Sequence, residues 1–173
     1  MQNFLVSIAG PDRLGLVSSV SAALFDIGAD LGEAAFTSVG GDARFTVIAA
    51  IPGGNDTEVV RNALDGLEAL EGADVDITPV EPEALGAPPT EMTHVVHVQG
   101  RDQPGFLARM TEALIDYGAN IARLDTTRLE GSGGDDYRIR MYLFIPPERA
   151  DACLAALDNT ASQLGCSLKA RAL

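Results

Sequence analysis

One short motif, Gly-x-Asp-x-x-Gly, occurs twice in the chain, and both copies precede an apolar helical pattern. The first lies in "GPDRLGLVSSVSAALFDIGADL" from Gly10, and the second in "GRDQPGFLARMTEALIDYGANI" from Gly100. The first turn of a helix leaves amide N–H groups without partners, and these attract a carboxylate or another anion. Glycine lets a ligand approach such a backbone closely. The motif therefore predicts an anion-facing loop or, alternatively, a tight turn in which Asp12 and Asp102 cap the helices.

The spacing of this motif differs from that of two well-known phosphate-binding loops. It is not the Gly-x-Gly-x-x-Gly of dinucleotide-binding folds, and no Gly-Lys-Ser/Thr follows it as in a P-loop. The spacing alone therefore does not distinguish an anion-binding loop from a tight turn.

The two motifs belong to a longer internal repeat. At an offset of 90 residues, 8 of 22 positions are identical: Gly10, Asp12, Gly15, Ala23, Leu24, Asp26, Gly28 and Ala29 all recur. The match continues outward, because Ile51-Pro52 returns as Ile145-Pro146. Repeats of this kind indicate one structural unit made twice.

Each copy has the same predicted order of elements. Phe4, Val6 and Ile8 alternate as in a strand, while Val17, Val20, Leu24 and Ile27 recur at helical spacing before Gly28. Two strands at 31–39 and 44–51, a helix at 57–70 and a strand at 73–80 follow. This order predicts an α+β fold of two ferredoxin-like βαββαβ domains, each an antiparallel sheet with both helices on one face. We expect the first and third strands to run parallel, with the hairpin strand on one side and the fourth strand on the other.

The predicted domains are residues 1–80 and 93–173. The segment between them, 81–92, contains Pro82, Pro88 and Pro89 and is typical of a semi-rigid linker. A sheet with one open face and an open edge has reason to pair with a second copy, so we expect a homodimer.

The charge of the chain is strongly negative and unevenly distributed. The net charge is −13; residues 1–86 hold 14 acidic and 3 basic side chains, and residues 87–173 hold 11 acidic and 9 basic ones. Such a surface repels phosphate backbones, and the sequence shows no Lys/Arg cluster to offset this, which argues against direct nucleic-acid binding. The sequence shows no signal peptide and no long apolar run, so we expect a cytoplasmic protein without membrane contact.

The two repeated stretches resemble the opening strand, loop and helix of the ACT domain. That family has an acidic residue, a proline and a glycine before an apolar helix, and then a Gly-x-Asn-Ile close. The second copy matches with Asp102, Pro104, Gly105, Gly118, Asn120 and Ile121, whereas the first has Leu14 and Asp30 in place of the proline and asparagine. Two such domains in tandem resemble the glycine cleavage system transcriptional repressor group.

The resemblance implies a ligand, typically an amino acid, held at an interface between two ACT domains. The implied site comprises the loop after the first strand, the first helical turn and the start of the second strand. Its residues are Asp12, Arg13, Leu14, Gly15, Leu16, Asp30 and Leu31 in the first copy, and Asp102, Gln103, Pro104, Gly105, Phe106, Asn120 and Ile121 in the second. Asn120 is the side chain that the resemblance favours for a polar group of the ligand, and the second copy is the one that we expect to bind.

The resulting hypothesis is a regulatory amino-acid-sensing protein that is not an enzyme and acts through a protein partner, including indirect control of transcription. Two alternatives stay open: a ligand-free ACT-type assembly module, and a small enzyme on a ferredoxin-like fold. We expect no cofactor and no metal, because His94 and His97 lie three apart in a strand and point to opposite faces. Asp135 and Asp136 could bind a cation, but acidic turns are common.

The net charge yields a first prediction. The pure protein should show no measurable DNA affinity at physiological salt, because net repulsion opposes phosphate contacts. A gel shift with the full chain checks this, and a salt-dependent shift would contradict it.

Overall fold

The computed structural model describes residues 1–53, 57–81, 91–129 and 136–173. The chain divides into two compact units, residues 1–87 and 88–173. Most of the predicted linker at 81–92, and Asp135 of the predicted acidic turn, lie outside the described residues.

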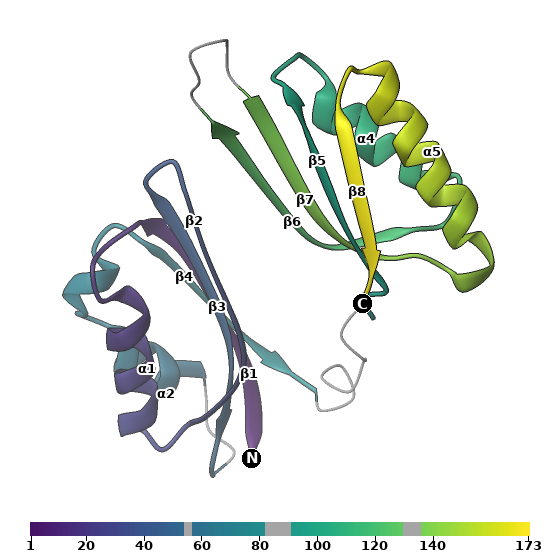
Figure 1. Cartoon of the computed structure of the whole chain (residues 1–173). Helices are drawn as coiled ribbons and strands as arrows, with labels where there is room; N and C mark the ends of the chain where they lie inside the picture. The colour runs from purple at the N-terminus through teal and green to yellow at the C-terminus, as the bar shows by residue number, and fades with distance from the viewer. Residues whose placement is uncertain (54–56, 82–90, 130–135) are drawn as a thin grey trace. The chain divides into compact units, whose positions relative to one another are not determined.

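The first unit is built from strands and helices in the predicted order (Figure 1). Its elements are β1 (Gln2–Pro11), α1 (Leu16–Asp26), β2 (Asp30–Val39), β3 (Asp42–Ile51), α2 (Thr57–Leu64), the 3-10 turn η1 (Glu68–Leu70) and β4 (Asp74–Val80). The second unit repeats this order with β5 (His94–Arg101), α4 (Phe106–Ile115), β6 (Asn120–Leu129), β7 (Asp136–Phe144), the 3-10 turn η2 (Pro147–Arg149), α5 (Ala150–Gln163) and β8 (Ser167–Ala172).

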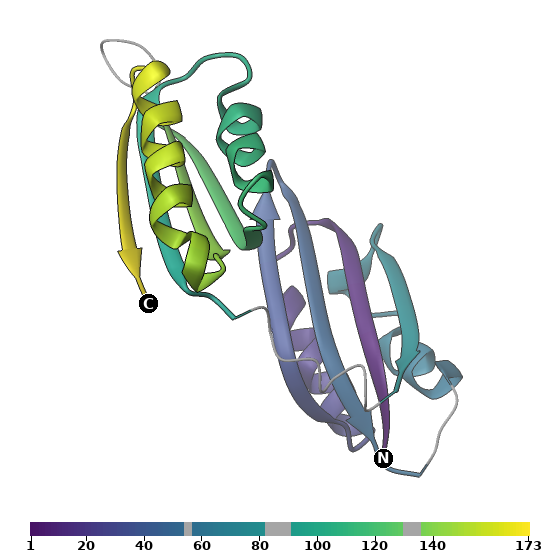
Figure 2. The same ribbon diagram turned by 90° about the vertical axis from the view of Figure 1, so that its right-hand side faces the viewer.

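The two sheets have the same topology, which confirms the predicted α+β fold of two ferredoxin-like units. The strand orders are β2-β3-β1-β4 and β6-β7-β5-β8, and every pairing is antiparallel. Figure 2 shows α4 and α5 together on one face of the second sheet.

One topological expectation is wrong. The first and third strands are antiparallel neighbours, with Phe4 opposite Ala49 in the first unit and Val96 opposite Met141 in the second. The helical crossover makes β1 parallel to β2, and β3 then returns between these two strands as the second arm of the hairpin. The predicted places of the hairpin strand and the fourth strand are confirmed.

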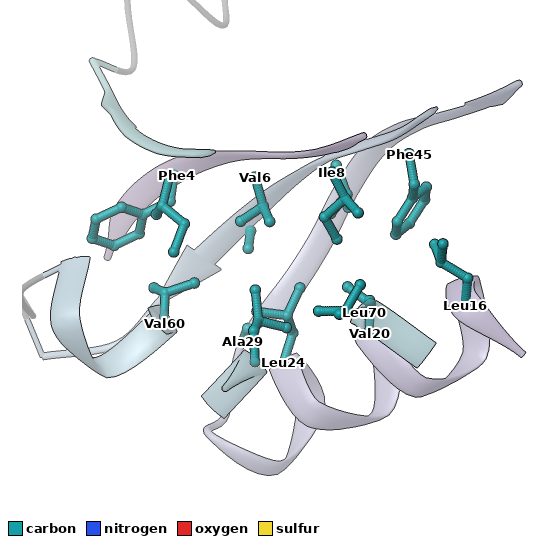
Figure 3. Close-up of a cluster of buried hydrophobic side chains, with 14 of the residues drawn as sticks. Phe4, Val6, Ile8, Leu16, Val20, Leu24, Ala29, Phe45, Val60 and Leu70 are labelled. Carbon is teal, nitrogen blue, oxygen red and sulfur yellow. The ribbon is translucent and has the colours of Figure 1, made fainter. Parts of the chain in front are cut away.

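The first core forms between its sheet and its helices (Figure 3). Phe4, Val6 and Ile8 of β1 face the two helices and are fully buried, with Phe4 above Val60 of α2. On α1 the buried positions are Leu16, Val20 and Leu24, whereas Val17 is exposed. The predicted helical face was therefore one residue out of phase at its start, since the helix begins at Leu16 and this residue turns inward.

The predicted helix at 57–70 is also interrupted. The helix α2 ends at Leu64, and the 3-10 turn η1 follows at Glu68–Leu70. Gly66 between them has a φ of 76°, a left-handed conformation that a continuous α-helix does not allow. Leu64 and Leu70 are still both buried in the first core.

The second core repeats this packing with different side chains. Strand residues of β5 and β7 pack against helix residues of α4 and α5. The strand residues are Val96, Val98, Ile139 and Met141, and the helix residues are Phe106, Met110, Leu114, Cys153 and Leu157.

Among the described residues, no helix is long and apolar enough to cross a bilayer.

Steric contact and backbone conformation explain the two glycines of the repeated motif. A Cβ on Gly10 would lie 2.6 Å from Cα and Cβ of Ala73, and a Cβ on Gly100 would collide with Cys166. Gly15 and Gly105 are the N-cap residues of α1 and α4, with φ of 83° and 79°. The first glycine of each motif thus permits close packing against the residue just before the last strand, and the second permits the sharp turn into the helix.

The close approach at Gly10 leads to a stability prediction. Gly10→Ala should lower the free energy of unfolding by about 1–3 kcal/mol, because the extra methyl meets the Ala73 backbone. Urea unfolding of the full chain measures this.

Gly32→Ala is the matched control, because its added Cβ would lie at an ordinary 3.7 Å from Ile48. We expect this variant to stay within about 0.5 kcal/mol of the unaltered chain. Equal losses in the two variants would contradict the steric explanation.

Candidate ligand-binding loops and the basic sheet face

A hollow of about 350 Å³ lies over the loop of the second unit. Its lining comprises Asp102, Gln103, Pro104, Gly105 and Phe106 of the loop and helix start, Leu107 and Ala108 of α4, Arg128 of β6 and Tyr137 of β7. Five of the seven residues predicted for the second copy therefore share one cavity. A Cβ on Gly105 would meet nothing within 4 Å, so this side of the loop is open to a ligand.

Three contacts hold the loop and the helix start against other parts of the second unit. Asp102 Oδ2 pairs with Arg128 Nε at 2.8 Å, and these side chains are 25% and 69% exposed. Gln103 Nε2 donates a hydrogen bond of 2.8 Å to the carbonyl oxygen of Leu164, just beyond α5. The ring of Phe106 packs against that of Tyr137 with centroids 5.7 Å apart. The hollow therefore has a fixed floor and a charged rim of both signs.

The start of α4 adds backbone donors to this hollow. The Phe106 amide donates to the Gln103 carbonyl at 3.2 Å. The amides of Leu107 and Ala108, which follow in the first turn, have no hydrogen-bond partner among the described residues. The positive end of the helix dipole lies at the same place, so an anionic group is favoured there.

The alternative in which the aspartates cap the helices is wrong. Neither Gly15 nor Gly105 is accompanied by a capping side-chain hydrogen bond. Asp12 Oδ2 instead accepts a hydrogen bond of 2.6 Å from Ser38 Oγ, just as Asp102 binds Arg128. Ser38 of β2 and Arg128 of β6 are separated by 90 residues, the offset of the repeat, and are therefore equivalent positions. Each aspartate thus connects its loop to the same position of the second strand in its unit.

The first-copy loop is arranged differently around the same backbone. Arg13 Nη2 pairs with Glu71 Oε2 at 3.4 Å, while Arg13 Nε is buried without a partner among the described atoms. Leu14 projects fully into solvent. The hollow beside this loop is lined by Arg13, Leu14, Ser19, Leu67, Glu68 and Ala69, and it includes neither Asp12 nor Gly15. Because serine stands where the second copy has Arg128, this loop lacks the guanidinium next to its aspartate.

The residues predicted at the start of the second strand lie apart from the loops. Asn120 and Ile121 line a separate hollow with Ala108, Thr111, Glu112, Leu114, Ile115 and Ala119, along α4. Asn120 begins β6 next to the end of α4, whereas the loop lies at the helix start. In the first copy Asp30 is exposed, and Leu31 packs against the core beneath α1, whose buried Leu16 begins the helix. The structure thus divides the predicted residues of each copy between the two ends of one helix.

Arg128 and Tyr137 line the loop hollow and were missed by the sequence interpretation. They follow the loop by about 25 to 35 residues on the hairpin strands, and only the sheet pairing opposes Arg128 to Tyr137. A signal for Arg128 was nevertheless present, because the repeat aligns it with Ser38.

Strand pairing also brings together a cluster of cationic side chains that are far apart in the sequence. We call it the basic face; its cations are Arg123 of β6, Arg138 and Arg140 of β7, and Lys169 and Arg171 of β8. Asp125 of β6 lies on the same face opposite Arg140, and its carboxylate pairs with Arg123 Nε at 3.0 Å. The register places Arg140 and Lys169 on either side of His97, and Arg138 opposite Gln99. The alternating neighbours Ile139 and Met141 are buried under the helices, so these cations lie on the opposite, helix-free face. The expectation of no Lys/Arg cluster is therefore wrong.

The basic face changes the titration of His97. Burial, and then the positive charges of Arg140, Arg138 and Arg171, lower the pKa of His97 below its usual 6.5. His94 points to the other face, where Thr93 Oγ1 lies 2.8 Å from its Nδ1. The two histidines therefore lie on opposite faces, as the strand period predicts.

A family model of the ACT domain matches residues 2–78. Residues 2–78 are an ACT domain. The second unit repeats its strand order, register and loop, so the chain is a tandem of ACT-type domains.

Solved structures with the tandem ACT-type fold extend this result. An unknown protein from Galdieria sulphuraria is 26% identical, with a TM-score of 0.84 over 99% of this chain and 98% of that one. A proposed glycine cleavage system transcriptional repressor is 12% identical, with a TM-score of 0.60 over 99% and 97%. At that identity the second match shows the fold alone. No curated protein matches the chain in a comparison of sequences.

The lowered pKa of His97 gives a prediction about pH. Because the pKa of His97 is lower in the folded chain than in the unfolded chain, the unfolded chain binds more protons below about pH 6.5. The free energy of unfolding should therefore decrease as the pH falls below about 6.5.

Arg140→Gln should move the pKa of His97 back toward 6.5, and an NMR titration that follows the ring signals of both histidines measures this. Arg109→Gln on α4 serves as the control, and an unchanged His97 in the Arg140 variant would contradict the electrostatic cause.

Proposed function

We propose that this protein is a regulatory amino-acid sensor that binds its ligand at the loop of the second ACT-type domain. The match of residues 2–78 to the ACT family supports a regulatory ligand-binding role in general. The observation that favours this loop is the pairing of Arg128 with Asp102 beside the open first turn of α4.

The rim of the second hollow is complementary to the backbone of a free amino acid. A ligand carboxylate would meet the amides of Leu107 and Ala108 and the guanidinium of Arg128, which all donate hydrogen bonds. A ligand ammonium would meet Asp102. Phe106 and Tyr137 would supply the apolar surface for a side chain.

The first loop supports binding less well, for reasons visible in its contacts. Ser38 replaces the guanidinium next to Asp12, and Arg13 already pairs with Glu71. We therefore propose that the second domain is the sensing domain. The proposed role is regulatory rather than catalytic, with a signal passed on to a protein partner.

Asn120, the side chain that the family resemblance favours for ligand binding, lies outside the hollow over the loop. Asn120 and Ile121 line a second hollow along α4, which shares only Ala108 with the loop hollow. We therefore propose that the two sets do not hold one small ligand within a single domain. Asp30 and Leu31 hold the corresponding positions in the first copy. If these residues contribute to binding, they do so from another ACT-type domain, as the family resemblance implies.

Thermal unfolding of the full chain in the presence of each common amino acid tests this proposal. A ligand at 100 times its Kd stabilises the folded state by about 2.7 kcal/mol, which is a readily measured rise in Tm. No stabilisation by any amino acid would contradict the sensor proposal and favour the ligand-free assembly module.

A matched pair of variants then locates the site. Arg128→Gln should raise the Kd about tenfold or more, because a hydrogen bond to a charged group contributes about 1.5–3 kcal/mol. Arg109→Gln removes an arginine of α4 outside the hollow and should leave the Kd unchanged. Equal affinity in both variants would place the ligand elsewhere.

A further inference from the structure

The helix-free face of the first sheet has the opposite charge to the basic face. It carries Asp30, Asp42, Asp74 and Asp76, which we call the acidic face, together with Arg44. Asp74 and Asp76 lie opposite Ala9 and Ser7 of β1. The buried alternating neighbours Phe4, Val6 and Ile8 turn toward the helices, so these aspartates lie on the other side.

The inversion of charge holds at equivalent positions of one repeated fold. Asp76 lies opposite Ser7, and Lys169 lies opposite His97, which is the repeat equivalent of Ser7. Arg140 likewise occupies the place of Thr46 beside that residue. The same sheet position is thus acidic in one copy and basic in the other, although the backbone is unchanged.

Two further positions of the last strand change in the same direction. Asp74 of the first copy is replaced by Ser167, since each is paired with the matching residue of the central strand. Thr78 is replaced by Arg171 in the same way. Two positions do not follow this direction, because Ala35 is replaced by Asp125 and Asp42 by Asp136. The replacements of Thr46 by Arg140, Asp76 by Lys169 and Thr78 by Arg171 still place three additional cations on the second face.

Both faces also have a partly apolar centre. Leu5 and Ile48 of the first sheet and Tyr142 of the second are half-buried, and Val95 is buried on the helix-free side. The guanidinium of Arg123 lies 5.7 Å from the centre of the Tyr142 ring. An apolar centre with charged residues around it is the usual composition of a protein interface.

We propose that the basic face of one copy of this chain docks on the acidic face of a second copy. Opposite charges at corresponding sheet positions favour this occupant, because complementary potentials fix the register of two surfaces. A nucleic acid fits less well. It is longer than the basic face, and its phosphates outside this face would be repelled by a chain of net charge −13. The contact joins two different surfaces and is therefore heterologous. Repetition of such a contact produces either a closed ring of chains or an open filament.

Complementation between two variants tests the proposal in the full chain. The first variant, Arg140→Gln with Lys169→Gln, neutralises the centre of the basic face. The second, Asp74→Asn with Asp76→Asn, neutralises the acidic face. All four side chains are exposed, so each variant should fold, which circular dichroism and urea unfolding check.

Sedimentation velocity gives the assembly state. The unaltered chain should assemble beyond a monomer at low salt and dissociate at about 1 M salt, where the Debye length falls to about 3 Å. Each variant alone should be monomeric. An equimolar mixture should form dimers only, because the first variant keeps an acidic face and the second keeps a basic one.

A control variant and three outcomes keep the test decisive. Arg109→Gln alters an exposed charge on α4 and should assemble like the unaltered chain. A monomeric unaltered chain at all salt concentrations, full assembly by both face variants, or a mixture that stays monomeric would each overturn the proposal. So would tight binding of a single-stranded oligonucleotide that is lost in the Arg140/Lys169 variant.

Discussion

Placement of both helices on one face of each sheet is the constraint on which the other features of the protein depend. The central strands β1 and β5 are paired on both sides, so their alternate side chains must be either under the helices or on the free face. Phe4 and Val96 therefore enter the cores, while Ser7 and His97 remain on the free faces. The cores, the loops and the charged faces all follow from this division.

The loop geometry depends on the same arrangement. For α1 and α4 to cover the sheet, the chain must turn sharply after β1 and β5, and the left-handed glycines Gly15 and Gly105 provide that turn. The turn leaves the first amides of α4 facing outward near Asp102 and Arg128. A strictly structural requirement thus brings amide donors, a guanidinium and a carboxylate together at the start of one helix.

Divergence between the two copies has occurred where the backbone does not restrict it. Gly10 and Gly100 are retained because a Cβ there would collide with the chain before the last strand. Exposed positions have changed freely, as Ser38 and Arg128 beside the loops and Asp76 and Lys169 on the free faces show. One fold therefore presents two loops of different chemistry and two sheet faces of opposite charge.

The sequence by itself determined the repeat, the ferredoxin-like order of elements and the glycine loops, because alternation, helical spacing and glycine act over a few neighbouring residues. It did not determine that β3 runs antiparallel to β1, that Gly66 ends the second helix of the first unit, or that Arg128 lies beside Asp102. The tertiary structure alone decided that Arg138, Arg140, Lys169 and Arg171 share one face. Pairing between strands far apart in the chain brings such side chains together, and no local pattern records it.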